Sequence, residues 1–282
     1  MTSLTTAGPT VSLLMTTYRG EQAERLRRSL EMTFQQSHPP GQVILVLDGP
    51  VGADQEQVIQ EYSADRRIAE MRVVRLDTNQ GLASALNAGL EHCTGEWIMR
   101  MDSDDESLIN RTEIQLAFLR DHPDVDLLGT WATEYYEDSP VTRVKSSPVT
   151  HDAIAQALKW RNLICHPSVM MRATALRAIG GYRTSFPFLE DWDLFVRFVL
   201  SGARLAAIPK ALVRVRCSEA QTARRGGWRY VLSEVRFRVF CWQAGFISLR
   251  QLLLITSAYT AFRLAGTGVR GLLYATVRTQ EV

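Results

Sequence analysis

The stretch Asn79–Asp105, NQGLASALNAGLEHCTGEWIMRMDSDD, decides the fold of this 282-residue chain. Its segment Leu82–His92 is predicted to be a helix, and Trp97–Met101 is a short apolar run typical of a buried strand. Three carboxylates follow that strand within four residues, at Asp102, Asp104 and Asp105. Because like charges repel, such a cluster is tolerated where it is solvated or where it holds a cation. Taken alone it fits an acidic loop; at a strand's C-terminal end it also fits the ligand crevice of an α/β sheet.

The strands and helices predicted around this stretch indicate a mainly parallel sheet. Short apolar runs bounded by Gly, Pro, Asn or Asp alternate with helical patterns, as expected for strands covered on both faces. The first predicted strands are Val11–Met15, Val43–Leu47, Arg72–Arg75 and Trp97–Met101. The helices between and after them are Glu21–Gln36, Asp54–Tyr62, Leu82–His92 and Asn110–Arg120.

The second half of the chain is less regular. Its predicted strands are Asp126–Trp131, Arg204–Ile208 and Leu212–Val215, the last two as edge strands. Its predicted helices are Asp152–Trp160, Ala173–Ile179, Asp191–Leu200, Trp228–Ala244, Leu249–Phe262 and Val269–Val277. We therefore divide the chain into an N-terminal extension (1–10), an α/β domain (11–227) and a basic, amphipathic helical region (228–282).

The net charge of +2 conceals an asymmetry. From Ala203 to Val282 there are thirteen Arg or Lys and three Glu, a balance of +10, so the rest of the chain carries −8. A basic, apolar tail on an acidic body is typical of a segment that meets an anionic partner. Arginine-punctuated helices can lie on an anionic membrane surface, or they can pack on the domain with their arginines outward.

Four cysteines lie far apart without CxxC spacing, which indicates neither a zinc site nor a disulfide framework. The first ten residues lack the pattern of a signal peptide, and no uncharged apolar run reaches the length of a membrane span. From this we expect a reducing, cytoplasmic location.

Polar residues follow the first two predicted strands. Thr16 and Tyr18 come after the first, where an aromatic ring can stack on a planar base, and Asp48 closes the second, where a carboxylate can accept a hydrogen bond from a base or sugar. Turn formation is the structural alternative for both segments. In Asp102-Ser103-Asp104, alternate carboxylates on an extended segment would let one face a sugar while the other meets Mg²⁺ or Mn²⁺.

Two further segments can carry chemistry. Glu190, Asp191 and Asp193 precede an apolar helix; they suit either helix-dipole compensation or a general base for an incoming hydroxyl. Arg224 and Arg225 stand before two glycines, which suits a loop closing over a diphosphate, or a solvated loop.

With these motifs together, the chain resembles the family-two glycosyltransferases, inverting enzymes of GT-A fold that use nucleotide-sugar donors. The resemblance covers about residues 11–230. VSLLMTTYRG and VILVLDGP look like the two nucleotide-binding strands, MDSDD like the DxD motif, and FLEDWDLFVR like the segment with the catalytic base. HPSVMMR, GGYR and RRGG are similar to a bacterial subgroup that builds exopolysaccharide, capsule or O-antigen, including amylovoran-type enzymes.

The resemblance implies roles for particular residues. Thr16, Tyr18 and Asp48 would line the base and ribose pocket, and Asp102 would contact the nucleoside or sugar. Asp104 would ligate Mn²⁺ or Mg²⁺, and Asp191 would be the general base. The chain departs from the family at Thr16-Thr17-Tyr18-Arg19, where Pro-Val-Tyr-Asn is common, and at Asp48-Gly49-Pro50, where Asp-Asp-Gly-Ser is common. Cys217 stands near the place of a late metal-binding His, which leaves a second protein ligand open.

The expected reaction is transfer of a hexose from a nucleoside-diphosphate sugar to a lipid-linked saccharide at the inner face of the cell membrane. UDP is the nucleotide expected in the donor. No nucleic-acid partner is expected. A nucleotidyltransferase would need a glycine-rich N-terminal loop and a dinucleotide oxidoreductase a GxGxxG segment, and residues 11–20 have neither. A glycoside hydrolase would not need a nucleotide pocket. A non-catalytic saccharide- or nucleotide-binding protein of the same fold is the remaining alternative.

Overall fold

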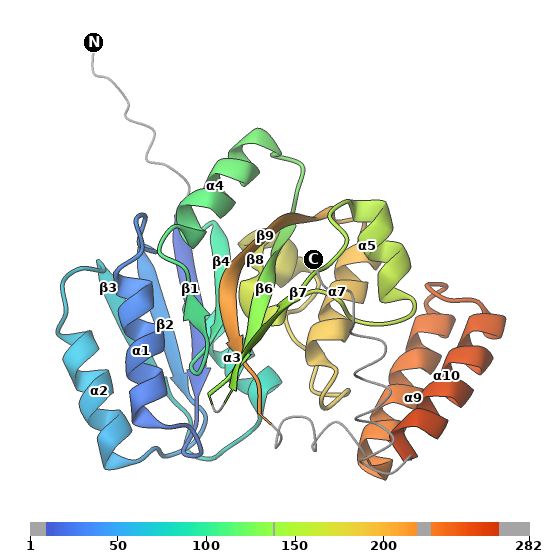
Figure 1. Ribbon diagram of the computed structural model, residues 1–282, viewed down its shortest axis with the longest axis horizontal. Helices are drawn as coiled ribbons and strands as arrows, with labels where there is room; N and C mark the ends of the chain where they lie inside the picture. Colours follow the sequence, from blue (N-terminus) through green and yellow to red (C-terminus); the bar gives the residue numbers. More distant parts are fainter. Residues whose placement is uncertain (1–9, 138, 219–226, 265–282) are drawn as a thin grey trace.

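The computed structural model describes residues 10–137, 139–218 and 227–264. Within them, nine strands form one sheet in the order β3-β2-β1-β4-β8-β6-β9-β5, with β7 paired to β6 (Figure 1). The strands are β1 Val11–Thr17, β2 Gln42–Leu47, β3 Glu70–Arg75, β4 Trp97–Asp102, β5 Glu106–Ser107, β6 Leu127–Tyr136, β7 Ser139–Lys145, β8 Met170–Arg172 and β9 Leu205–Arg216. β1 to β4 are mutually parallel, whereas β8 runs antiparallel between β4 and β6.

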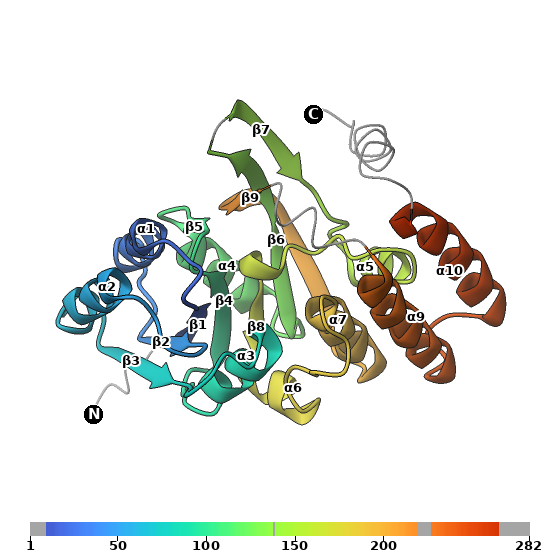
Figure 2. The same ribbon diagram turned by 90° about the horizontal axis from the view of Figure 1, so that it is seen from below.

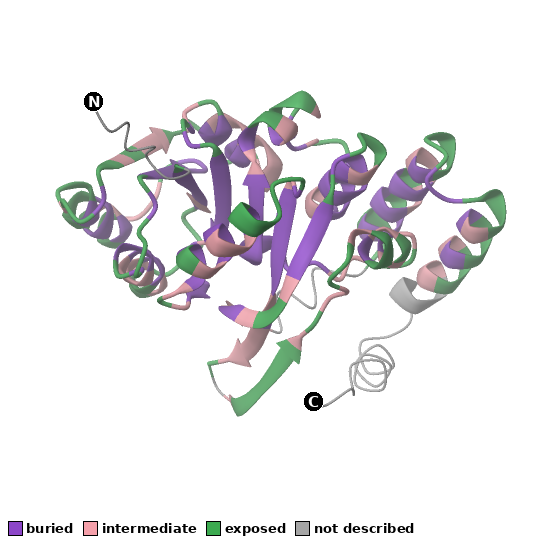
Figure 3. Ribbon diagram, turned by 90° about the horizontal axis from the view of Figure 1, so that it is seen from above, coloured by how far each residue is buried: buried purple, intermediate pink, exposed green. Residues whose placement is uncertain are grey.

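Helices cover both faces of the sheet, because successive apolar side chains of each strand point to opposite faces. Leu13 and Met15 pack with α1 Ala23–Phe34, α2 Ala53–Ser63 and α4 Arg111–Asp121. Leu14 packs on the other side. That side is covered by α3 Leu82–Leu90, α5 His151–Leu158, α6 Ala173–Ala178, α7 Glu190–Leu200 and α9 Trp228–Gln243. β1, β2 and β4 are buried along nearly their whole length, and β7 is largely exposed (Figure 3).

The α/β prediction and the parallel arrangement of the first four strands are confirmed. Three strands were not predicted: β5, β7 and β8. The two strands predicted at 204–208 and 212–215 are one strand, β9, so that prediction is wrong. It pairs in parallel with β6 along most of its length, and the register shifts beside Trp131 take up the extra residues around Pro209. The helix predicted at 269–277 lies outside the described residues.

Helix α3 lies unusually close to the sheet. A Cβ atom at Gly89 would stand 2.4 Å from Leu14 Cδ1 and 2.6 Å from Val46 Cγ2. Because interiors are close-packed and contacts this short are strongly repulsive, only glycine fits at this distance. The backbone of α3 therefore rests directly on the side chains of β1 and β2.

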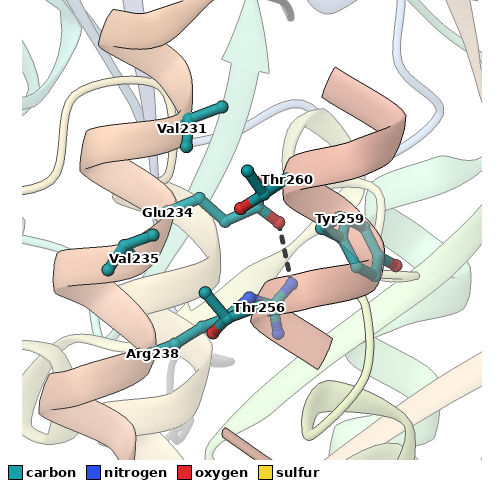
Figure 4. A pocket seen from close by; sticks show the side chains of 7 residues that line it. All are labelled: Val231, Glu234, Val235, Arg238, Thr256, Tyr259 and Thr260. Atoms are coloured by element: carbon teal, nitrogen blue, oxygen red, sulfur yellow. Dashed lines mark hydrogen bonds and ion pairs between the residues drawn. The ribbon is translucent and has the colours of Figure 1, made fainter. Parts of the chain in front are cut away.

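The C-terminal helices α9 and α10 (Leu249–Leu264) form a pair at one end of the molecule, beside α5 and α7 (Figure 2). Between them, Arg238 donates to the Glu234 carboxylate at 2.8 Å, and both side chains are buried (Figure 4). The Arg238 guanidinium also stacks over the rings of Trp192 in α7 and Tyr259 in α10. Phe237 of α9 belongs to the same hydrophobic core as α7, so α9 is packed on the α/β layers. Among the helices described, none is both long and apolar enough to cross a bilayer.

Candidate active site

A cavity of about 650 Å³ opens at the C-terminal ends of β1, β2 and β4. Parallel neighbours end at the same edge of a sheet, so residues distant in sequence meet there. Polar side chains around it include Thr16, Thr17, Tyr18, Glu21, Asp48, Asn79, Gln80, Ser84, Asp102, Asp104, Arg183, Glu190 and Arg216. The structure thus brings into one cavity four residues predicted to bind the donor and the predicted metal ligand: Thr16, Tyr18, Asp48, Asp102 and Asp104.

Asp48 joins the end of β2 to the start of α3. Its two carboxylate oxygens accept hydrogen bonds from the backbone amides of Gln80 (2.6 Å) and Gly81 (3.0 Å). The next residue, Gly49, has φ +84°, and a side chain there would meet Asn79 N at 2.7 Å. Asp48 therefore has a structural function in the cavity wall whether or not it also contacts a ligand.

The carboxylates after β4 form a compact group. One oxygen from each of Asp102, Asp104 and Asp105 can be chosen so that all three lie within 4.8 Å of one another. Asp105 Oδ2 is buried without a hydrogen-bond partner, and Asp102 is about one-third exposed to the cavity side. Hard oxygen ligands with an unsatisfied buried carboxylate fit Mg²⁺ or Mn²⁺. The residues present therefore suit the divalent cation that the sequence indicated.

Arginine side chains neutralise this group from two sides. Arg216, at the end of β9, donates to Asp104 Oδ2 from Nε (3.1 Å) and Nη2 (2.8 Å). Arg100, fully buried in β4, donates to Asp102. Even so, burial of Asp104, and secondly the negative charge of Asp102, raise the pKa of Asp104 to about 6. Burial also raises the pKa of Asp105 well above its ordinary value. Two arginines thus face three closely spaced carboxylates.

The acids at the start of α7 have different surroundings. Glu190 lines the cavity, and burial together with the charge of Asp191 raises its pKa to about 7. Asp191, the predicted base, is not among the described residues around the cavity. Its Oδ2 accepts from Asn162 Nδ2 at 2.8 Å and its Oδ1 from Trp192 N at 2.7 Å. Asp193 is fully buried and bonded to Arg197 (2.7 Å), so it is structural.

Sequence reasoning missed several residues of the cavity. Arg183, Arg216 and Glu21 were not singled out, and Glu190 was noted only as one of three acids. The start of a helix predicted from sequence is uncertain by one or two residues. A shift of one residue changes whether position 190 or position 191 faces the cavity. The ion pair of Arg216 joins residues 112 apart, and no local pattern predicts it. Arg224 and Arg225, the predicted diphosphate-binding residues, lie outside the described residues.

Sequence comparisons agree with this geometry. A model of the family described as glycosyl transferase family 2 matches residues 12–180, more than half of the chain. The chain belongs to glycosyl transferase family 2. The amylovoran biosynthesis glycosyltransferase AmsE of Erwinia amylovora is 34% identical over 84% of this chain and 88% of that protein. An Escherichia coli UDP-Gal:alpha-D-GlcNAc-diphosphoundecaprenol beta-1,3-galactosyltransferase is 30% identical over 95% of this chain and 96% of its own length.

Solved structures show the same fold. Staphylococcus aureus TarS residues 1–349, in complex with UDP, has a TM-score of 0.67 at 17% identity, covering 93% of this chain and 74% of that one. The Pyrobaculum calidifontis mannosyltransferase PcManGT, in complex with GDP-Man and Mn²⁺, has a TM-score of 0.59 at 16% identity, covering 96% and 80%. The predicted family-two membership and GT-A-type fold are confirmed, and the protein is a glycosyltransferase. These family-two relatives argue against the nucleotidyltransferase and the non-catalytic alternatives.

Proposed function

We propose that the protein is a metal-dependent, inverting hexosyltransferase that uses a nucleoside-diphosphate sugar in the synthesis of a bacterial cell-surface polysaccharide. The observation that carries the proposal is that Asp104 shares one cavity with Tyr18 and Asp48, at the ends of three neighbouring strands. A cavity of about 650 Å³ has the size of a small-molecule site.

The donor is proposed to be UDP-linked. TarS was solved with UDP and with UDP-GlcNAc, and the Escherichia coli relative is named for UDP-Gal. In this chain, Tyr18 is 41% exposed at the cavity, where its ring can stack on a base. Thr16 and Asp102 complete the proposed nucleoside contacts, with Asp48 holding the wall behind them.

Asp104 and its neighbours Asp102 and Asp105 would hold the divalent cation. When bound, Mn²⁺ or Mg²⁺ would supply positive charge for the leaving diphosphate. The described cavity side chains include five carboxylates, at Glu21, Asp48, Asp102, Asp104 and Glu190, but two arginines. A diphosphate entering this surface needs added positive charge, which is why the proposal includes a cation.

Asp191 is the proposed general base. It would take the proton of the acceptor hydroxyl while that oxygen attacks the anomeric carbon opposite the diphosphate, breaking the bond from that carbon to the phosphate oxygen. Asn162, in the segment that follows α5, donates to Asp191 Oδ2 and holds it in place. Glu190 stands one residue away on the cavity wall, and its pKa of about 7 makes it the competitor for this role.

The acceptor is proposed to be a lipid-linked saccharide at the inner membrane surface. The outer side of α10 exposes Leu249, Leu253 and Leu254 by 51 to 66% each, next to the exposed Arg250. Such a surface suits an interface with acyl chains below and anionic headgroups beside it. The Escherichia coli relative is named for a diphosphoundecaprenol-linked acceptor, which supports the same class here.

A thermal-shift screen tests the donor and the cation together. Nucleoside diphosphates and their sugars are added to the protein with and without Mn²⁺. We expect one nucleotide to stabilise the protein, and only when Mn²⁺ is present. Equal stabilisation without metal would contradict the metal-dependent part. Release of a nucleoside diphosphate from the sugar donor on acceptor addition supports glycosyl transfer, whereas release of a sugar 1-phosphate would indicate nucleotidyl transfer.

A further inference from the structure

Arg216 stands where a cation bound to Asp104 would compete with it. Its guanidinium makes two hydrogen bonds to Asp104 Oδ2 and is 11% exposed, with Asp104 14% exposed. Both residues line the cavity at the end of β4. A guanidinium keeps its charge at every working pH, so it shields Asp104 as a permanent cation.

The backbone of Arg216 is fixed independently of its side chain. Its amide donates to Asp105 Oδ1 at 2.9 Å, and it lies in register with Tyr135 at the end of the β6–β9 pairing. The next amide, of Cys217, donates to Tyr135 O at 2.7 Å. Arg216 can therefore change its partner by side-chain rotation alone. Because the residue lines the cavity, its long side chain can reach a ligand there.

The charge balance indicates what the released side chain would meet. Arg183, the other arginine at the cavity, stacks over Phe240 and lies 3.6 Å from Asp193. While Arg216 is paired with Asp104, neither arginine is free of a carboxylate neighbour. A divalent cation on Asp104 would add two positive charges and release a third, all facing the same cavity.

We propose that Arg216 is a donor-binding residue that exchanges partners: it pairs with Asp104 before the cation binds and passes to the diphosphate when the cation takes Asp104. This rests on the proposed function. The exchange couples cation and nucleotide binding: the cation releases Arg216 for the diphosphate, and the nucleotide draws Arg216 away from Asp104. Cation affinity is therefore lower without nucleotide than with it.

Direct Mn²⁺ binding, followed by the electron paramagnetic resonance of the free ion at about pH 8 where Asp104 is ionised, tests the exchange. The proteins are wild type, Arg216→Gln and Arg214→Gln, each with and without UDP. Arg214 lies two residues earlier on β9, pairs with Glu106 at 2.9 Å and is not among the described cavity residues, so it is the matched control.

We expect Arg216→Gln to bind Mn²⁺ about tenfold more tightly than wild type without UDP, since the competing charge-assisted pair is gone. The same variant should bind UDP about tenfold more weakly at saturating Mn²⁺. Arg214→Gln should match wild type in both. Tighter Mn²⁺ binding together with weaker UDP binding is expected only if the Arg216 side chain serves both Asp104 and the diphosphate.

Two outcomes separate failure of the exchange from failure of the proposed function. If wild type binds Mn²⁺ with UDP but Arg216→Gln shows unchanged or weaker Mn²⁺ binding alone, the exchange is refuted and the metal-dependent function stands. If wild type binds no Mn²⁺ even with UDP, the metal-dependent function itself fails. A thermal unfolding curve for each variant confirms that it is folded, and Arg216→Lys, which keeps the charge, should show little of the Mn²⁺ gain.

Discussion

The hydroxyl of Ser233 donates a hydrogen bond to the carbonyl oxygen of Pro187 at 2.7 Å, which fixes helix α9 to the wall of the cavity. Next to it, Phe188 has φ +71° and stacks on Tyr230 with ring centroids 5.6 Å apart. A left-handed conformation is costly for phenylalanine and persists only where the surroundings hold it. The division of the chain at residue 227 stays a prediction, but α9 supports the loop that closes the cavity.

We expect Ser233→Ala to lower the free energy of unfolding by about 1 kcal/mol, because the hydrogen bond to the Pro187 carbonyl is lost. Nucleotide binding should weaken as well, since Pro187 and Phe188 line the cavity. Denaturant unfolding and calorimetric titration measure the two effects. Ser201→Ala is the control: its hydroxyl bonds to Phe198 O within the end of α7, so nucleotide binding should not change. Unchanged binding in both variants would contradict the link.

Asp191→Asn should abolish transfer while leaving donor affinity close to wild type, because the amide cannot take up the proton and the residue is not on the cavity wall. Rates and nucleotide affinity are measured on the same preparations. Glu190→Gln is the paired variant. If it abolishes transfer and Asp191→Asn keeps near-normal turnover, Glu190 is the base.

Asp104→Asn should weaken donor binding by about tenfold in the presence of Mn²⁺ but not without metal, where the release of Arg216 from residue 104 should strengthen it. The reason is that a neutral amide is a poorer ligand for a hard cation. Titration of UDP with and without Mn²⁺ measures this. Asp152→Asn, in the first turn of α5, is the control for loss of an acid elsewhere. Equal weakening with and without metal would place Asp104 outside the cation site.

Glu190 should make the stability of the protein fall as pH rises. Its pKa is raised from 4.5 to about 7, so the folded state binds more protons than the unfolded state between these values. Glu190→Gln should therefore gain on the order of 2 kcal/mol over wild type at pH above about 7, and the gain should vanish below about pH 4.5. Denaturant unfolding across this range measures it.

The control for this pH dependence is Glu31→Gln. The hydrogen bond from Arg67 lowers the pKa of Glu31 to about 2, so its stabilising contribution is lost only as pH falls below the ordinary range of a carboxylate. Its effect should be the same at pH 5 and at pH 8. A gain for Glu190→Gln that did not depend on pH would show that Glu190 acts through packing.

Binding to anionic vesicles should depend on the outer side of α10. Leu253→Glu with Leu254→Glu should weaken it by about tenfold, because two apolar side chains become charged. Val141→Glu on β7, where the wild-type side chain is 57% exposed, adds one such charge elsewhere and should have little effect. Co-sedimentation with vesicles measures both. Equal binding by all three proteins would exclude this surface.

The elements that the sequence predicted well are those with a strong local pattern. β1, β2 and β4 are continuous apolar runs, and the carboxylates that follow them could be assigned to one edge because parallel strands end together. β7 could not be recognised, because SPVTRVK is exposed on nearly every residue and has no apolar face. β8 has three residues and β5 two, too short to show a period.

β9 was predicted as two strands because Pro209 and Lys210 interrupt its apolar run. In the structure a shift of register beside Trp131 absorbs the interruption, and the strand continues. At the site, Asp104 could be predicted as a metal ligand from the local MDSDD motif. Its pairing with Arg216 depends on how β9 comes to lie beside the end of β4, which is a property of the whole sheet.

The absence of a side chain at Gly89 has a consequence for how this site can evolve. Helix α3 begins at Leu82, and residues 82–84 line the cavity, so the height of the helix above the sheet contributes to the depth of that cavity. A single methyl group at position 89 would lift the helix and alter that depth without changing any residue that touches a ligand. The shape of the cavity can thus be changed from beneath, at a residue that is not among its described lining residues.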